Sequence, residues 1–141
     1  MSVSVEVTIE RSPAEVFDHV ADGERLPDWM EQFEYVRGGP PGPGASYRYR
    51  MSRGAESSFE YSEYDPPRRV AWTGPAVRAG PGSLAPNGSF TVEPADGGSR
   101  VLLELDPRPG GVFRLLLPLL RRSMRASAVQ DLSRLKAQLE K

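Results

Sequence analysis

The 141-residue chain contains no cysteine and only one histidine, His19. The lack of cysteine excludes structural disulfides, thiolate nucleophiles and zinc sites built on thiolates. His19 alone would have to serve any Ser-His-Asp triad or imidazole metal site, and its place in the sequence indicates the flank of a surface helix. Carboxylates are scattered, and no glycine-rich run has the spacing of a phosphate loop. We therefore predict neither a metal ion nor an organic cofactor.

The chain also lacks an excess of charge and a long apolar run. Its 18 basic and 19 acidic side chains give a net charge of -1, which argues against a nucleic-acid partner. The most apolar stretch, residues 112–120, falls far short of the roughly 20 residues that cross a membrane, and Arg114 and Pro118 interrupt it. We interpret it as a buried helix without an integral membrane segment, with membrane contact as the alternative. Because residues 1–10 alternate instead of forming a leader, we assign the protein to the cytoplasm.

A periodic pattern over residues 119–141 predicts a long amphipathic helix. About 22 residues at roughly 1.5 Å each give a rod of about 33 Å, which can cross a small domain. We expect Pro118 to kink the helix or restart it. Charged residues, among them Asp131 and Arg134, are assigned to the solvent-facing side. The predicted buried stripe consists of Leu119, Leu120, Met124, Ala128, Leu132, Leu135 and Leu139.

Strand and helix signals alternate at the start of the chain. Residues 3–9 have a strict period of two, which predicts a half-buried strand. Residues 12–15 form a capping box with proline at the first helical position, so a helix should begin there. Residues 26–33 again place proline in a first helical turn and space Trp29 for burial. We therefore predict two short helices after the first strand.

The middle of the chain predicts an antiparallel sheet. The Gly/Pro-rich residues 38–44 form a turn, and residues 74–88 form a connection longer than an ordinary hairpin loop. Sequential strands separated by turns favour antiparallel pairing, so the whole chain, 1–141, is predicted to be one α+β domain whose sheet wraps the last helix. The predicted strands after the turn are residues 46–53, 57–64, 69–73, 89–93 and 100–106.

Several short motifs resemble one superfamily over nearly the whole chain. They are SPAEVF at 12–17, LPDW at 26–29, YDPPRRVAW at 64–72, GGSRV at 97–101 and DLSRLK at 131–136. They are similar to the START-like helix-grip superfamily, also called SRPBCC, and in particular to its polyketide cyclase/dehydrase and lipid transport branch. The resemblance implies a curved antiparallel sheet around the C-terminal helix, two short helices after strand one, and a cavity for a hydrophobic or amphipathic small molecule. It does not name that molecule.

Strand parity predicts which side chains face the cavity. Phe59, Tyr61 and Glu63 share one side of their strand, while Arg48 and Arg50 point to solvent unless a one-residue bulge inverts the register. On an apolar face, Glu63 would have a raised pKa and could act as a general acid or base. The predicted ligand contacts are Trp29, Tyr47, Tyr49, Met51, Phe59, Tyr61, Trp72, Phe90, Leu120 and Met124.

Three hypotheses about function follow. The first is a non-catalytic protein that binds a hydrophobic small molecule in the cavity, and it rests on the absence of a recognisable nucleophile, metal cluster or cofactor loop. The second is a metal-free cyclase, aromatase or dehydratase in which Glu63 moves protons and pocket tyrosines stabilise an enolate. The third is a ligand-free protein-interaction module that uses residues 74–88 or the arginines at 121–125. The sequence leaves the ligand and the oligomeric state open.

Overall fold

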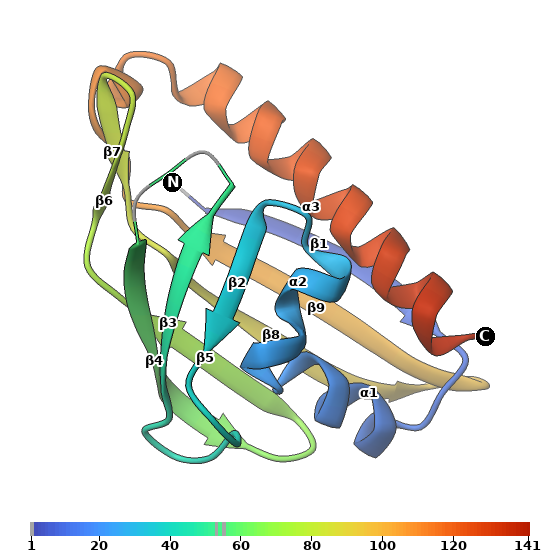
Figure 1. The fold of residues 1–141 in the computed structure, drawn as a ribbon. Helices are drawn as coiled ribbons and strands as arrows, with labels where there is room; N and C mark the ends of the chain where they lie inside the picture. Colours follow the sequence, from blue (N-terminus) through green and yellow to red (C-terminus); the bar gives the residue numbers. More distant parts are fainter. Residues whose placement is uncertain (1, 53, 55) are drawn as a thin grey trace.

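The computed structural model describes residues 2–52, 54 and 56–141, and a long helix lies across one strongly curved antiparallel sheet (Figure 1). This is the predicted helix-grip fold of the α+β class. The elements, with 3-10 helices labelled η, are β1 (Val3–Ile9), α1 (Pro13–Val20), η1 (Gly23–Arg25), α2 (Leu26–Trp29), β2 (Phe33–Arg37), β3 (Ser46–Met51), β4 (Glu56–Asp65), β5 (Arg69–Thr73), β6 (Val77–Ala79), β7 (Gly82–Leu84), β8 (Asn87–Ala95), β9 (Gly98–Asp106), β10 (Gly110–Gly111), η2 (Val112–Arg114) and α3 (Leu117–Leu139).

The main sheet has seven strands in the order β1-β9-β8-β5-β4-β3-β2, so β1 and β2 form its edges. A second sheet of three short strands has the order β10-β7-β6. The predicted loop at residues 74–88 is therefore wrong in part, because it contains the β6–β7 hairpin. Strands of three residues carry too little alternation to be recognised from sequence. This hairpin lies beside the start of α3 in Figure 1.

Both short helices begin where the sequence predicts, and the second ends earlier than predicted. In α1, the Oγ of Ser12 accepts the Glu15 N–H at 3.3 Å, which satisfies one free amide of the first turn. The Ser12 hydroxyl also lies 3.1 Å from the Glu15 carboxylate, so that carboxylate bonds the hydroxyl and not the Ser12 amide of the expected box. Helix α2 ends at Trp29, and Phe33 already begins β2.

Pro118 lies in the first turn of α3, where its missing N–H breaks no helical bond. Of the two expected effects, the kink is therefore wrong and the new start is confirmed: the residues before the helix form β10 and η2. Three residues of the predicted stripe, Ala128, Leu132 and Leu135, are fully buried against the sheet. The first turns differ, because Leu119 is exposed, and the expectation of a buried helix over this apolar stretch is wrong.

In the part of the chain that is described, no helix is both long enough and apolar enough to cross a membrane.

The ring of Tyr47 packs directly on the backbone of Gly23, and this contact joins β3 to η1. A Cβ at Gly23 would lie 2.6 Å from the Tyr47 ring. We expect Gly23→Ala to lower the free energy of unfolding by about 1–3 kcal/mol, because the buried Tyr47 has little room to move. Urea unfolding measures the change. The matched variant Gly42→Ala, at a position with nothing within 4 Å, should stay within about 0.5 kcal/mol of wild type. Equal stabilities of the two variants would contradict the contact.

Candidate functional site

A cavity of about 730 Å³ lies between the concave face of the main sheet, the β6–β7 hairpin and α3. This volume is in the range of small-molecule sites, roughly 300–1,000 Å³. Its wall is predominantly apolar and aromatic, and it combines residues from strands far apart in the sequence. The apolar residues that line it include Val20, Leu26, Met30, Phe33, Tyr49, Met51, Phe59, Tyr61, Trp72, Val77, Leu84, Phe90, Leu103, Leu105, Met124 and Ala128.

The exposed members of the wall mark where the cavity opens. They come from the α2–β2 connection, the β3–β4 turn, β6 and the middle of α3, so these four segments border the opening. These segments are far apart in the sequence and meet only in the folded chain. The exposed lining residues are Glu31, Ser52, Gly54, Arg78, Ser127 and Gln130.

Seven of the ten predicted ligand contacts lie on this wall. Strand parity correctly places Tyr49, Met51 and Phe59 on the wall of the cavity. It is also correct for Arg48 and Arg50, which are exposed on the opposite face of the sheet. The predicted residues on the wall are Tyr49, Met51, Phe59, Tyr61, Trp72, Phe90 and Met124. Their contact with a ligand remains a prediction.

The other three predicted contacts, Trp29, Tyr47 and Leu120, are not part of the wall. Trp29 is fully buried behind it, with its ring centroid 5.6 Å from that of Phe90. Tyr47 lies on the backbone of Gly23 and is shielded from the cavity. Leu120 is partly exposed near the start of α3, one turn before the first lining residue of that helix. Large aromatic size predicts burial well but cannot separate a cavity wall from the core behind it.

Glu63 lies outside the cavity, so the predicted inward orientation is wrong. The pairing of β4 with β5 shifts between Tyr61 and Glu63, and Ser62 is the extra residue of this bulge. The shift turns Tyr64 inward in its place, where its ring packs against Tyr61 at 6.2 Å. The Glu63 carboxylate is 49% exposed and accepts a 3.0 Å hydrogen bond from Arg69 Nε. This carboxylate does not line the cavity and therefore cannot exchange a proton with a ligand there.

The two tyrosines on the wall differ in what their hydroxyls can do. The hydroxyl of Tyr61 donates to the Ala21 carbonyl oxygen at 2.6 Å, so its only proton is used within the fold. Burial raises the pKa of Tyr61, and neighbouring Tyr47 raises it further. Burial also raises the pKa of Tyr49. Both phenols are thus neutral at physiological pH, and they serve as apolar wall with polar tips rather than as proton acceptors.

The wall contains an ion pair between buried Asp131 and partly exposed Arg134, and sequence patterning assigned both residues to solvent. Asp131 is only 2% exposed, and its Oδ1 bonds the Arg134 guanidinium while its Oδ2 accepts from Gln32 Nε2 at 3.1 Å. The Nε of Arg134 donates to the Trp29 carbonyl oxygen at 3.0 Å. At the rim, Glu31 lies 3.7 Å from the same guanidinium. We call Gln32, Asp131 and Arg134 the polar cluster; it joins α3 to the α2–β2 connection beside the opening.

Burial raises the pKa of Asp131, although Gln32 and Arg134 oppose the shift by favouring the carboxylate. An ionised carboxylate only accepts hydrogen bonds, whereas a protonated carboxyl group can also donate one. A raised pKa favours the protonated form, so Asp131 can offer either kind of bond to a ligand. Arg134, whose side chain is 30% exposed, adds hydrogen-bond donors to the cavity wall. The cluster therefore provides both hydrogen-bonding senses at one end of an otherwise apolar cavity.

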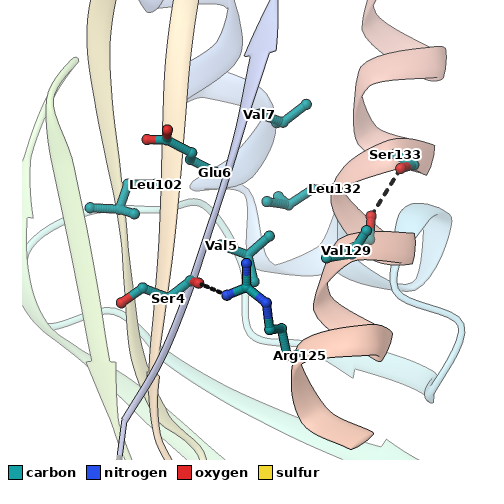
Figure 2. Close-up of a pocket in the computed structure, with 9 residues that line it drawn as sticks. All are labelled: Ser4, Val5, Glu6, Val7, Leu102, Arg125, Val129, Leu132 and Ser133. Carbon is teal, nitrogen blue, oxygen red and sulfur yellow. Dashed lines mark hydrogen bonds between the residues drawn. The ribbon is translucent and has the colours of Figure 1, made fainter. Parts of the chain in front are cut away.

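A second hollow, of about 490 Å³, lies on the other side of α3, between that helix and the edge strand β1. Figure 2 shows Arg125 reaching from the helix to the Ser4 carbonyl oxygen, which it bonds at 2.7 Å. Most of its lining residues are exposed, including Glu6 and Val129, so it is a surface groove and not an enclosed site. We take the larger cavity as the functional site because its wall is mainly apolar and most of its lining residues are buried or partly buried.

The chain matches the model of one protein family and shares its fold with solved structures. A family model described as polyketide cyclase / dehydrase and lipid transport matches residues 1–140. The chain belongs to this family. No curated protein sequence matches the chain. The family's range of functions leaves the activity of this member to be argued from its own cavity.

Solved structures share the fold at low sequence identity. A conserved protein from Geobacillus kaustophilus has a TM-score of 0.79 and 12% identity, covering 99% of this chain and 95% of that one. A protein from Thermus thermophilus has a TM-score of 0.77 and 21% identity, covering 99% and 97%. The di-domain ARO/CYC BexL from the BE-7585A biosynthetic pathway has a TM-score of 0.75 and 20% identity; the match covers 97% of this chain but 45% of BexL. At such identities the likeness shows the fold alone.

The raised pKa of Asp131 predicts how Asp131→Asn changes the pH dependence of stability. The folded state holds the Asp131 proton more tightly than the unfolded state does, so this group stabilises the fold most below its ordinary pKa of 3.8. That contribution is lost as the pH rises through the raised pKa. Because asparagine does not titrate, the variant should gain stability relative to wild type between pH 4 and pH 7. Urea unfolding of both proteins across this range measures the difference, and the opposite slope would contradict the burial effect.

Proposed function

We propose that the protein binds an amphipathic small molecule in the cavity between sheet and helix, without catalysing its conversion. The observation that carries this proposal is a mainly apolar cavity of about 730 Å³ whose wall holds the Asp131–Arg134 ion pair beside the opening. The apolar body of the ligand would lie against Phe59, Phe90 and Leu103, and its polar group would lie at the polar cluster. Membership of a family described by cyclase, dehydrase and lipid transport functions supports a ligand of this class.

Burial of apolar surface would supply most of the affinity. At about 25 cal/mol per Å², a ligand that removes roughly 300 Å² of apolar surface from water gains about 7.5 kcal/mol before the cost of association. A polar group at the cluster adds orientation more than affinity, since its bonds with water are exchanged for bonds with Asp131 and Arg134. A purely apolar ligand would leave that end of the cavity without a partner. For this reason we favour an amphipathic molecule over a hydrocarbon.

The position of Glu63 counts against the enzymatic alternative in the form that sequence suggested. Its carboxylate is exposed and paired with Arg69 on the outside of the sheet. Of the three tyrosines predicted to stabilise an enolate, Tyr61 has its hydroxyl engaged with a backbone carbonyl and Tyr47 lies behind the wall, while Tyr49 lies on the wall. The ligand-free interaction hypothesis also loses support, because the β6–β7 hairpin within residues 74–88 forms part of the cavity wall. No observation favours either alternative over binding.

Filling the cavity from α3 tests the proposal. Met124 lines the cavity and is partly exposed, so Met124→Trp can add volume without replacing a fully buried residue. We expect the affinity for the apolar fluorophore N-phenyl-1-naphthylamine to fall at least tenfold, because the indole would occupy the fluorophore's space. Fluorescence titration measures this change. Native mass spectrometry of the purified wild type, followed by organic extraction, would identify any ligand that remains bound.

Val129→Trp is the matched control, because Val129 is an exposed residue of the same helix that lines the outer groove and not the cavity. It should bind the fluorophore as wild type does. Loss of binding in Val129→Trp with normal binding in Met124→Trp would move the site to the outer groove. Binding that neither substitution changes would show that the fluorophore does not enter the cavity, and it would refute the proposal.

A further inference from the structure

Four leucines around the start of α3 remain exposed although they form the most apolar stretch of the chain. Leu115 is 80% exposed and Leu119 is 64% exposed. They account for most of the exposed large apolar side chains in residues 2–52, 54 and 56–141, and all lie within five consecutive positions. Apolar side chains clustered in this way mark an interaction surface more often than single exposed residues do. The four are Leu115, Leu116, Leu117 and Leu119.

The same region has a strong local positive charge. Residues 107–130 contain five arginines and no acidic residue, whereas the rest of the chain has 13 basic and 19 acidic residues. Arg114, Arg121 and Arg122 are exposed, and within the described parts of the chain no carboxylate lies within 4.0 Å of their guanidinium groups. We call these three arginines and the four leucines the leucine–arginine patch.

The patch is attached to the wall of the cavity. Phe113 of η2 packs on Gly82 of β7, where an added Cβ would lie 2.6 Å from its ring. Strand β7 continues to Leu84, which lines the cavity, and α3 continues from the patch to Met124, which also lines it. Figure 1 shows the start of α3 and the β6–β7 hairpin together at one end of the molecule. The patch therefore lies at the end of the molecule where these two walls of the cavity begin.

We propose that the leucine–arginine patch docks this protein on an anionic lipid membrane surface. Leucines at an interfacial helix end insert at the boundary between headgroups and acyl chains, and neighbouring arginines bind lipid phosphates while their stems stay apolar. Anionic lipid complements both properties of the patch at once. This inference goes beyond the proposed ligand binding and does not depend on it.

A second copy of the chain fits the patch less well. A two-fold contact places the same surface on both partners, so Arg114, Arg121 and Arg122 of one copy would face those of the other. Like charges at an interface oppose association unless counter-charges separate them, and residues 107–130 contain no acidic side chain. Self-association is therefore an outcome that the test must distinguish and not the occupant that the charges favour.

Vesicle flotation tests the proposal, with vesicles of phosphatidylcholine alone and of phosphatidylcholine with about 30% phosphatidylglycerol. We expect wild type to float with the anionic vesicles at about 50 mM salt and to be released as salt rises. Leu115→Ser/Leu119→Ser should weaken binding at least tenfold, because both side chains are exposed in solution and buried only on the membrane. Arg121→Gln/Arg122→Gln should weaken it about 25-fold, since each arginine near an anionic surface strengthens binding about fivefold.

Two control variants match these changes elsewhere. Val129→Ser removes an exposed apolar residue of α3 outside the patch, and Arg37→Gln/Arg48→Gln removes two exposed charges from paired positions of β2 and β3. Both should bind vesicles as wild type does. Equal binding to neutral vesicles, or wild-type binding by either patch variant, would overturn the proposal. Absence of vesicle binding would also overturn it; if sedimentation then showed a dimer that Leu115→Ser/Leu119→Ser abolishes, the patch would be a self-interface.

Discussion

The packing of the second half of α3 against the sheet determines the rest of the structure. Ala128, Leu132 and Leu135 are buried there, and the helix is also bonded to the edge of the sheet, where Lys136 donates to the Thr8 carbonyl oxygen at 2.6 Å. The helix has 23 residues, so at about 1.5 Å per residue its first half extends well beyond this contact. Leu117 and Leu119 are exposed in this first half, and Met124 there lines the cavity.

The polar cluster costs desolvation free energy, yet it both holds α3 in place and lines the cavity. A buried carboxylate loses its hydration, and the raised pKa of Asp131 shows that Gln32 and Arg134 only partly compensate for that loss. The same two partners connect α3 to the segment between α2 and β2, which fixes one side of the opening. An apolar residue in place of Asp131 would remove the desolvation cost, but it would leave Arg134 and Gln32 without their shared acceptor.

Periodicity predicted most of the fold and part of the site. Alternation identified the main strands and gave the correct inward face for Tyr49 and Phe59. It succeeds there because the face of a strand residue follows from its position relative to its neighbours in sequence. It failed at Glu63, since a single extra residue in β4 reverses every face beyond it and has no sequence signature here. It failed again at Asp131, whose burial depends on Gln32, 99 positions away. The exposure of the leucines was not predicted. An apolar side chain favours burial, but the sequence does not show whether the folded chain provides a surface against which it can pack.

Charge accounts for why such an apolar patch can persist on a protein in solution. Four exposed leucines favour association of any two copies, but a two-fold contact through them would place the neighbouring arginines of both copies at one interface, where like charges repel over a Debye length, about 8 Å at physiological ionic strength. At that range repulsion opposes the hydrophobic gain, and added salt weakens the repulsion while it leaves the hydrophobic gain in place. Binding to anionic lipid has the opposite salt dependence, because there the arginines attract. The sign of the salt effect therefore separates the two kinds of contact on physical grounds.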